Sequence, residues 1–181
     1  NRYWDGKIRL ANLRDNTIYA GLVQDIAKFS KDLDIQVEFE GTKNNMPGIE
    51  QNVSDKILDG FLDALDPHSG GKKIQMRDYQ VEAFKDGVRK QRMLCLSPTA
   101  SGKSLIIYAL ARWWRETHDK KILIIVPTIN LVSQMMSDFE DYSQGKFTDM
   151  HGISGGVDKN TDKRVVVSTW QSIHKKSAGY F

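Results

Sequence analysis

The sequence is short of cysteine, of clustered histidine and of long hydrophobic runs, and each shortage excludes a class of protein. Its single cysteine, Cys95, cannot form an internal disulfide, and its apolar surroundings predict a buried, inert thiol in a reducing compartment. The longest aliphatic run, Ile122–Val126, is far too short to cross a bilayer, which excludes a transmembrane protein. The four histidines are scattered and give no zinc-ligand spacing. No signal peptide is recognisable, so we expect a cytoplasmic location.

What is present is an ordinary globular composition with an uneven distribution of charge. The 181 residues are 40% hydrophobic and 27% charged, which suits one large or two small domains. Residues 1–72 carry 9 basic and 12 acidic side chains, whereas residues 73–181 carry 17 basic and 11 acidic ones. This basic excess favours a phosphate-rich partner for the second part of the chain.

The most informative segment is Ser-Pro-Thr-Ala-Ser-Gly-Lys-Ser at residues 97–104. It follows an apolar run that predicts a strand, Arg92–Leu96, and precedes apolar residues at helical spacing. A strand that turns into a helix through a small-residue loop ending in Gly-Lys-Ser is the design of a cradle for nucleotide phosphates. Lys103 is expected to reach the phosphates and Ser104 to hold Mg²⁺. The predicted nucleotide-binding residues of the loop are Pro98, Thr99, Ala100, Ser101, Gly102, Lys103 and Ser104.

The rest of the second part alternates helices and strands. Such alternation predicts an α/β fold with right-handed crossovers and a doubly wound parallel sheet. Within the helix at 130–141 we expect Leu131, Met135 and Phe139 to face inward. Besides Arg92–Leu96, the expected elements are a helix at 78–90, a helix after the loop, a strand at 121–126, the helix at 130–141 and a strand at 165–167.

The first part is predicted to be a small α+β domain. Its apolar pattern gives strands at 7–13 and 17–20, a helix containing Leu22 and Phe29, and a strand at 34–40. A polar linker at 41–53 precedes a short helix at 54–65, for which Ser54 is the expected N-cap. We place the domain boundary after this helix, which gives domains of residues 1–65 and 66–181.

Three further motifs accompany the loop. Tyr79-Gln80 lies upstream of it and resembles the aromatic–glutamine pair that precedes the phosphate loop in superfamily 2 helicases, where the amide can read adenine. Pro127-Thr128 with Gln134 resembles helicase motif Ia, whose threonine can bind a nucleic-acid phosphate. Thr169 with Gln171, after the strand at 165–167, resembles the next motif that contacts nucleic acid.

Taken in this order, the four motifs resemble the first RecA-like domain of a superfamily 2 helicase over Ile74–Phe181. The finer resemblance is to bacteriophage recombination and repair helicases, on Tyr3–Leu10, the glycine-poor loop and Ser168–Gln171. It implies ATP and Mg²⁺ as cofactors and a nucleic-acid-binding domain at 1–65, in which Tyr3 or Trp4 either stacks on bases or belongs to the core. The phosphate contacts that this implies in that domain are Arg2, Lys7, Arg9 and Arg14.

The resemblance also implies parts that the sequence does not contain. No Asp-Glu-x-His motif, which would orient Mg²⁺ and water, occurs before Phe181, and a second RecA-like domain is missing as well. The expected parent is an ATP-dependent helicase or translocase that acts on branched or single-stranded DNA, or on RNA in R-loops, in recombination, repair and replication. If it is phage-encoded, its location is the host cytoplasm. The alternatives are the motor of a restriction or excision-repair complex and a non-catalytic nucleic-acid-binding module with a relict nucleotide pocket.

Overall fold

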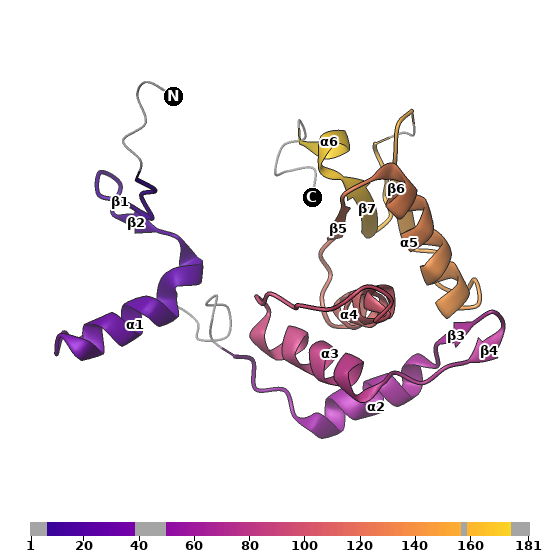
Figure 1. Ribbon diagram of the computed structural model, residues 1–181, viewed down its shortest axis with the longest axis horizontal. Helices are drawn as coiled ribbons and strands as arrows, with labels where there is room; N and C mark the ends of the chain where they lie inside the picture. Colours follow the sequence, from indigo (N-terminus) through magenta and orange to yellow (C-terminus); the bar gives the residue numbers. More distant parts are fainter. Residues whose placement is uncertain (1–6, 39–49, 157–158, 175–181) are drawn as a thin grey trace. The chain divides into compact units, whose positions relative to one another are not determined.

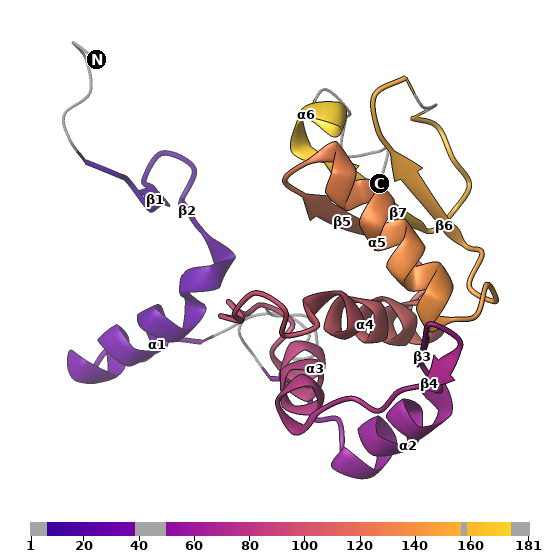
Figure 2. The same ribbon diagram turned by 45° about the vertical axis from the view of Figure 1, so that its right-hand side comes forward.

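The computed structural model describes residues 7–38, 50–156 and 159–174 (Figures 1 and 2). The chain divides into two compact units, one formed by residues 1–52 with 86–94 and the other by residues 53–85 with 95–181. Residues 53–65 therefore group with the second unit, although the predicted domain boundary lies after them. Arg2, Tyr3 and Trp4 lie outside the described residues.

In the first unit, a short hairpin precedes a helix. Strands β1 (Ala11–Asn12) and β2 (Thr17–Ile18) pair antiparallel, and α1 (Val23–Asp32) follows a 3-10 turn, η1 (Ala20–Leu22). The helix is confirmed, but the predicted strands at 7–13 and 17–20 shrink to two paired residues each. Residues 34–38 of the third predicted strand have no regular structure, and its last two residues lie outside the described range. A strand needs a neighbour for its backbone groups, and apolar alternation alone does not supply one.

The second unit begins with helices around an aromatic cluster. Helix α2 (Asp55–Leu65) leads through the hairpin of β3 (His68–Ser69) and β4 (Lys72–Lys73) to α3 (Asp78–Lys90), of which residues 78–85 belong to this unit. The sequence predicted the bounds of α3. Phe61 of α2 stacks on Phe84 of α3, with ring centroids 5.5 Å apart, and meets the edge of Trp113 at 5.2 Å. Ser54 occupies the predicted N-cap in extended conformation, but its side chain forms no capping hydrogen bond.

A parallel sheet and its helices form the rest of this unit. Strands β5 (Ile122–Val126), β7 (Val165–Thr169) and β6 (Met150–Ile153) lie side by side in that order, with Ile122 opposite Val165 and Val126 opposite Thr169. Every residue of the central strand β7 is buried. Helix α4 (Lys103–Thr117) follows the loop, α5 (Ile129–Tyr142) packs across β6 and β7, and α6 (Trp170–Ile173) ends the described chain (Figure 2). The predicted parallel α/β arrangement is confirmed.

Some side chains face other directions than predicted. Phe139 is buried as predicted and Met135 is partly buried, but Leu131 is 37% exposed and Val132 is buried in its place. The helix begins one residue earlier than expected, at Ile129, because Thr128 caps it. Strand β5 is not buried throughout, since Ile125 is half exposed.

The predicted strand at 92–96 is not formed. No described strand pairs with this segment, and Leu94 and Leu96 are 85% and 87% exposed. Cys95 is exposed as well, so the prediction of a buried thiol is wrong. Without a neighbouring strand, the backbone groups of residues 92–96 have no partner in a β-ladder, and their side chains have no core to pack against.

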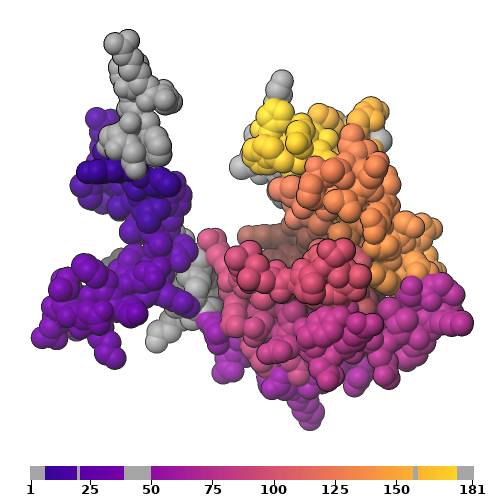
Figure 3. Space-filling model, in the orientation of Figure 1, coloured from indigo at the N-terminus to yellow at the C-terminus, as the bar shows by residue number. Residues whose placement is uncertain are grey.

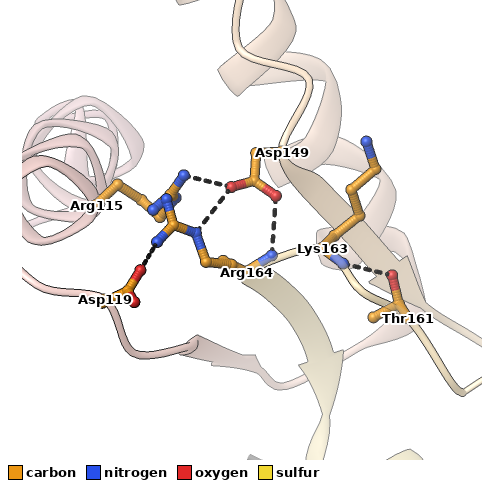
Figure 4. Close-up of polar contacts among 6 residues, drawn as sticks. All are labelled: Arg115, Asp119, Asp149, Thr161, Lys163 and Arg164. Carbon is orange, nitrogen blue, oxygen red and sulfur yellow. Dashed lines mark hydrogen bonds and ion pairs between the residues drawn. The ribbon is translucent and has the colours of Figure 1, made fainter.

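Charged side chains tie the amino ends of the strands together (Figure 4). Asp149, just before β6, accepts from Arg115 Nη2 at 2.5 Å and from the backbone N–H of Arg164, just before β7, at 3.0 Å. The Arg164 guanidinium also contacts Asp149, at 3.5 Å, and Asp119. Nε and Nη1 of Arg115 are buried without a hydrogen-bond partner. The positive charge of Arg115 is therefore balanced by its ion pair with Asp149.

We therefore expect Asp149→Asn to destabilise this unit. Removing the carboxylate leaves the buried Arg115 guanidinium without its counter-ion, which we expect to lower the free energy of unfolding by about 2–3 kcal/mol. Urea denaturation measures this loss. The control is Asp119→Asn, because the Asp119 side chain is fully exposed. Equal unfolding midpoints for the two variants would contradict the assignment.

Candidate functional site

The loop at 97–102 bends sharply into α4 through two residues in left-handed conformation. Ala100 has φ of +63° and Gly102, at the N-cap of α4, has φ of +74°. For alanine this conformation costs about 1–2 kcal/mol, and such strain concentrates at ligand-binding sites. Gly102 has no side chain with which to cap the helix. The amino end of α4, with its positive dipole, is therefore left to an anion.

The first turn of α3 holds the loop in this shape. Gln80 Nε2 donates to the Ser101 carbonyl at 2.9 Å and to the Gly102 carbonyl at 3.5 Å, and Tyr79 Oη donates to the Ser101 carbonyl at 3.0 Å. A Cβ on residue 102 would collide with Gln80 Nε2. Glycine is thus required at this position both by its φ and by the close approach of the glutamine.

Gln80 is engaged at both ends of its amide. Besides the two donated bonds, its Oε1 accepts from the Arg77 backbone N–H at 2.9 Å, and the residue is only 5% exposed. In this structure the amide positions the loop, and the predicted reading of adenine by Gln80 stays a prediction. Tyr79 is 42% exposed. Because its hydroxyl is fixed, its ring is held beside the loop.

Lys103 and Ser104 both have partners within the protein. The Lys103 ammonium donates to the carbonyl of Pro98 at 2.6 Å and to that of Ser97 at 3.4 Å, and its side chain is exposed. Ser104 Oγ hydrogen-bonds Tyr142 Oη, at the end of α5, at 2.8 Å. Both groups thus lie at the amino end of α4, where phosphate and a phosphate-bound cation would exchange with these protein contacts.

Tyr142 is a site residue that the motifs did not reveal. It lies 38 residues from Ser104, and no local pattern links the two. Burial raises the pKa of Tyr142 above its ordinary value, although its hydrogen bond with Ser104 acts in the opposite direction. The phenol therefore stays protonated and can donate to the serine hydroxyl.

The predicted nucleic-acid contacts divide into exposed and buried ones. Thr128 is exposed, and its Oγ1 caps α5 by accepting from the Leu131 N–H at 3.4 Å; Gln134 and Gln171 are exposed too. Thr169 is only 3% exposed, and its hydroxyl bonds Ser172 Oγ at 3.0 Å, so its side chain is turned inward. The register of β5 and β7 brings the segments after Val126 and Thr169 side by side. In the first unit Lys7, Arg9 and Arg14 are exposed.

Two classes of site are not found in the described part of the chain. Nowhere in it do three His, Cys, Asp or Glu side chains come together as metal ligands. None of the helices at residues 7–38, 50–156 and 159–174 has the length and apolar composition needed to span a membrane.

Residues 73–180 match the family model described as type III restriction enzyme, res subunit. The chain is 36% identical over 182 residues to the ATP-dependent DNA helicase uvsW of Enterobacteria phage T4, covering 98% of this chain and 35% of that protein. It is 30% identical over 130 residues to the DNA 3'-5' translocase XPB2 of Sulfurisphaera tokodaii, covering 71% of this chain and 26% of that protein. The chain thus spans about a third or less of these curated relatives.

Two crystal structures of T4 UvsW resemble the chain at 36% sequence identity. One aligns with a TM-score of 0.85 over 97% of this chain and 36% of the solved chain. The other, the UvsW helicase from bacteriophage T4, aligns with a TM-score of 0.84 over 97% of this chain and 63% of the solved chain.

We expect Gln80→Ala to loosen the loop. The substitution removes the donor to two loop carbonyls and leaves the Arg77 N–H unpaired, which should lower the free energy of unfolding by about 1–3 kcal/mol. Hydrogen exchange of the amides at 97–104 should become faster at the same time. Gln75→Ala removes an exposed glutamine just before α3 and is the control. Unchanged exchange in Gln80→Ala would show that the glutamine does not hold the loop.

The raised pKa of Tyr142 predicts a loss of stability in alkaline solution. Because the folded chain keeps its phenolic proton longer than the unfolded chain, this contribution is complete below the ordinary pKa of 10.0 and is lost as pH rises through the raised value. Tyr108, whose pKa burial also raises, and Lys85, whose pKa is raised by Asp59 and Asp55, titrate in the same direction.

Comparison of variants isolates the contribution of Tyr142. Urea unfolding of wild type and Tyr142→Phe, at neutral pH and above pH 10, should show a smaller alkaline loss in the variant. Tyr19→Phe, at a position 68% exposed, is the control. An alkaline loss as large in Tyr142→Phe as in wild type would contradict the prediction.

Proposed function

The chain belongs to the type III restriction enzyme res-subunit family, and from this we propose that it forms the first motor domain of an ATP-dependent DNA helicase or translocase. The comparisons also confirm the relationship to superfamily 2 helicases and the partial RecA-like fold. The observation that carries the proposal is the loop at 97–104, held by α3 and opening onto the amino end of α4. The domain boundary that we propose for this function is between residues 65 and 66.

In the proposed nucleotide site, each group exchanges a protein contact for a phosphate contact. Lys103 leaves the carbonyls of Ser97 and Pro98 for the β- and γ-phosphates, because an anion is a stronger partner for an ammonium than a carbonyl. Ser104 would exchange Tyr142 for Mg²⁺, to which it would supply a hydroxyl ligand; the cation would neutralise phosphate charge. Tyr79 would hold the base beside Gln80. The backbone of Pro98, Thr99, Ala100, Ser101 and Gly102 completes the cradle.

The proposed nucleic-acid site lies at the carboxyl edge of the sheet. Thr128 and Gln134 on α5, with Gln171 on α6, are exposed and can donate to backbone phosphates. Because the Thr169 side chain is buried, its proposed contact is through the backbone at the end of β7. Lys7, Arg9 and Arg2 are proposed as phosphate contacts of the N-terminal region.

The finer parts of the proposal follow the likeness to the phage helicase. Substrates would be branched or single-stranded DNA, or R-loops that contain RNA, in recombination, repair and replication. The location would be cytoplasmic, in the host if the gene is a phage gene. Turnover needs a carboxylate pair and a second motor domain, for which residues 1–181 hold no motif. We therefore expect this chain alone to bind ATP weakly or not at all, without steady-state hydrolysis.

One observation favours the second candidate, a nucleic-acid-binding module with a relict pocket. Lys103 and Ser104, the two side chains that the nucleotide needs, are both engaged by protein atoms. Salt-sensitive DNA binding that is indifferent to ATP would be the signature of such a module. The res-subunit match keeps the motor of a restriction complex as a further alternative.

Titration with a fluorescent Mg·ATP analogue tests the nucleotide site. Lys103→Ala should weaken binding by about 10- to 100-fold, because a charge-assisted contact contributes about 1.5–3 kcal/mol. Lys120→Ala, at an exposed lysine between α4 and β5, is the control and should bind like wild type.

The possible results separate the candidates. Equal binding by wild type and Lys103→Ala would remove the loop from nucleotide recognition. No binding by either would mean that the site needs the second motor domain to form or that the pocket is a relict. Steady-state hydrolysis by this chain that Lys103→Ala abolishes would contradict the expectation that further residues are needed for turnover.

A further inference from the structure

The described residues at the carboxyl edge of the sheet include no acidic side chain. Three segments form it, where β5 runs into α5 (122–137), where β6 ends (150–156) and where β7 runs into α6 (165–174). The chain contains 23 Asp and Glu residues, and none lies in these segments. Of the described carboxylates, the nearest in sequence are Asp138, in the second half of α5, and Asp149, at the amino edge; Asp158 lies outside the described residues. An edge without carboxylates suits a polyanion, since like charges do not oppose its approach.

Trp170 is exposed at this edge. It directly follows the buried strand β7, and 61% of its surface is accessible. The helix that carries it, yellow in Figure 3, lies at the molecular surface. By contrast, Trp113 and Trp114 are both partly buried. Tryptophan is largely buried in most proteins. The exposure of Trp170 beside a surface without carboxylates therefore indicates a ligand with an apolar face.

The support beneath Trp170 is rigid. Ile173, in the same turn of helix, is 3% exposed and packs with Ile153 and Val166 in the core. Thr169 and Ser172 bond one another across the same turn. The indole ring lies beside the His174 ring, with centroids 6.3 Å apart and planes inclined by 40°. The backbone that carries the exposed ring is therefore fixed before any ligand arrives, which lowers the entropic cost of binding.

We propose that Trp170 is a stacking platform for an unpaired base of single-stranded nucleic acid. This inference rests on the proposed function and adds to it the contact that recognises the base. Exposed donors flank the platform: Gln171 follows it, and Thr128 leaves the neighbouring strand β5 at the same edge. Such donors bind phosphate while the ring stacks on the base, and stacking accepts any base. A duplex cannot stack on Trp170 in this way, because the faces of its paired bases are already covered by their neighbours.

Binding of a fluorescein-labelled oligothymidylate, followed by anisotropy, tests the proposal. Trp170→Ala should weaken binding about 5- to 150-fold, and Trp170→Phe by much less, because a smaller aromatic ring still stacks. The dependence of affinity on salt should keep its slope in both variants, since no charge is lost. Ile57→Ala, which removes an exposed apolar side chain from α2, is the control and should bind like wild type.

Tryptophan emission gives a second measurement that a structural role would not change. Saturating oligothymidylate should quench the emission of wild type, and Trp170→Phe should bind while losing most of the quenching. Equal quenching by a duplex would overturn the assignment to an unpaired base. If wild type binds and Trp170→Ala binds equally well, the stacking platform is wrong while the proposed function stands. If wild type does not bind, the nucleic-acid part of the proposed function fails together with the platform.

Discussion

The candidate site depends on one contact, that of the first turn of α3 with the backbone carbonyls of Ser101 and Gly102. Gln80 and Tyr79 together supply the donors that fix these carbonyls. Their hydrogen bonds, at about 1 kcal/mol each, offset the left-handed conformation of Ala100. The direction in which α4 leaves the loop, and with it the placement of Lys103 and Ser104, follows from this contact. An upstream helix thus shapes the phosphate loop before a nucleotide binds.

The two edges of the sheet have opposite chemistry because its strands are parallel. All amino ends meet at one edge, where Asp149 forms ion pairs with Arg115 and Arg164. All carboxyl ends meet at the other edge, where the described residues include no carboxylate and Thr128, Trp170 and Gln171 are exposed. Between them the central strand β7 is wholly buried. Stability is therefore concentrated at the edge away from the proposed ligands, and the opposite edge is left to bind them.

Helices were predicted better than strands, for a physical reason. The α3 bounds could be read from the sequence because a helix satisfies its own backbone and needs only one apolar face. A strand must pair with another strand, and its own sequence does not identify which one. The segment at 92–96 reads as a strand but lacks a neighbour, so Cys95 is exposed. The strand β6 escaped prediction because Met-His-Gly-Ile has neither alternation nor an aliphatic run.

The sequence by itself determined the phosphate loop, the order of its companion motifs and the relationship to helicases, because these depend on residue types at short spacings. Only the tertiary structure decided what the side chains do. It engages both ends of the Gln80 amide, joins Tyr142 to Ser104, buries Thr169 and leaves Trp170 in solvent. These outcomes depend on partners that lie far apart in the chain or on which face of the sheet a residue meets. Tertiary packing determines these partners and faces, and no local sequence pattern predicts them.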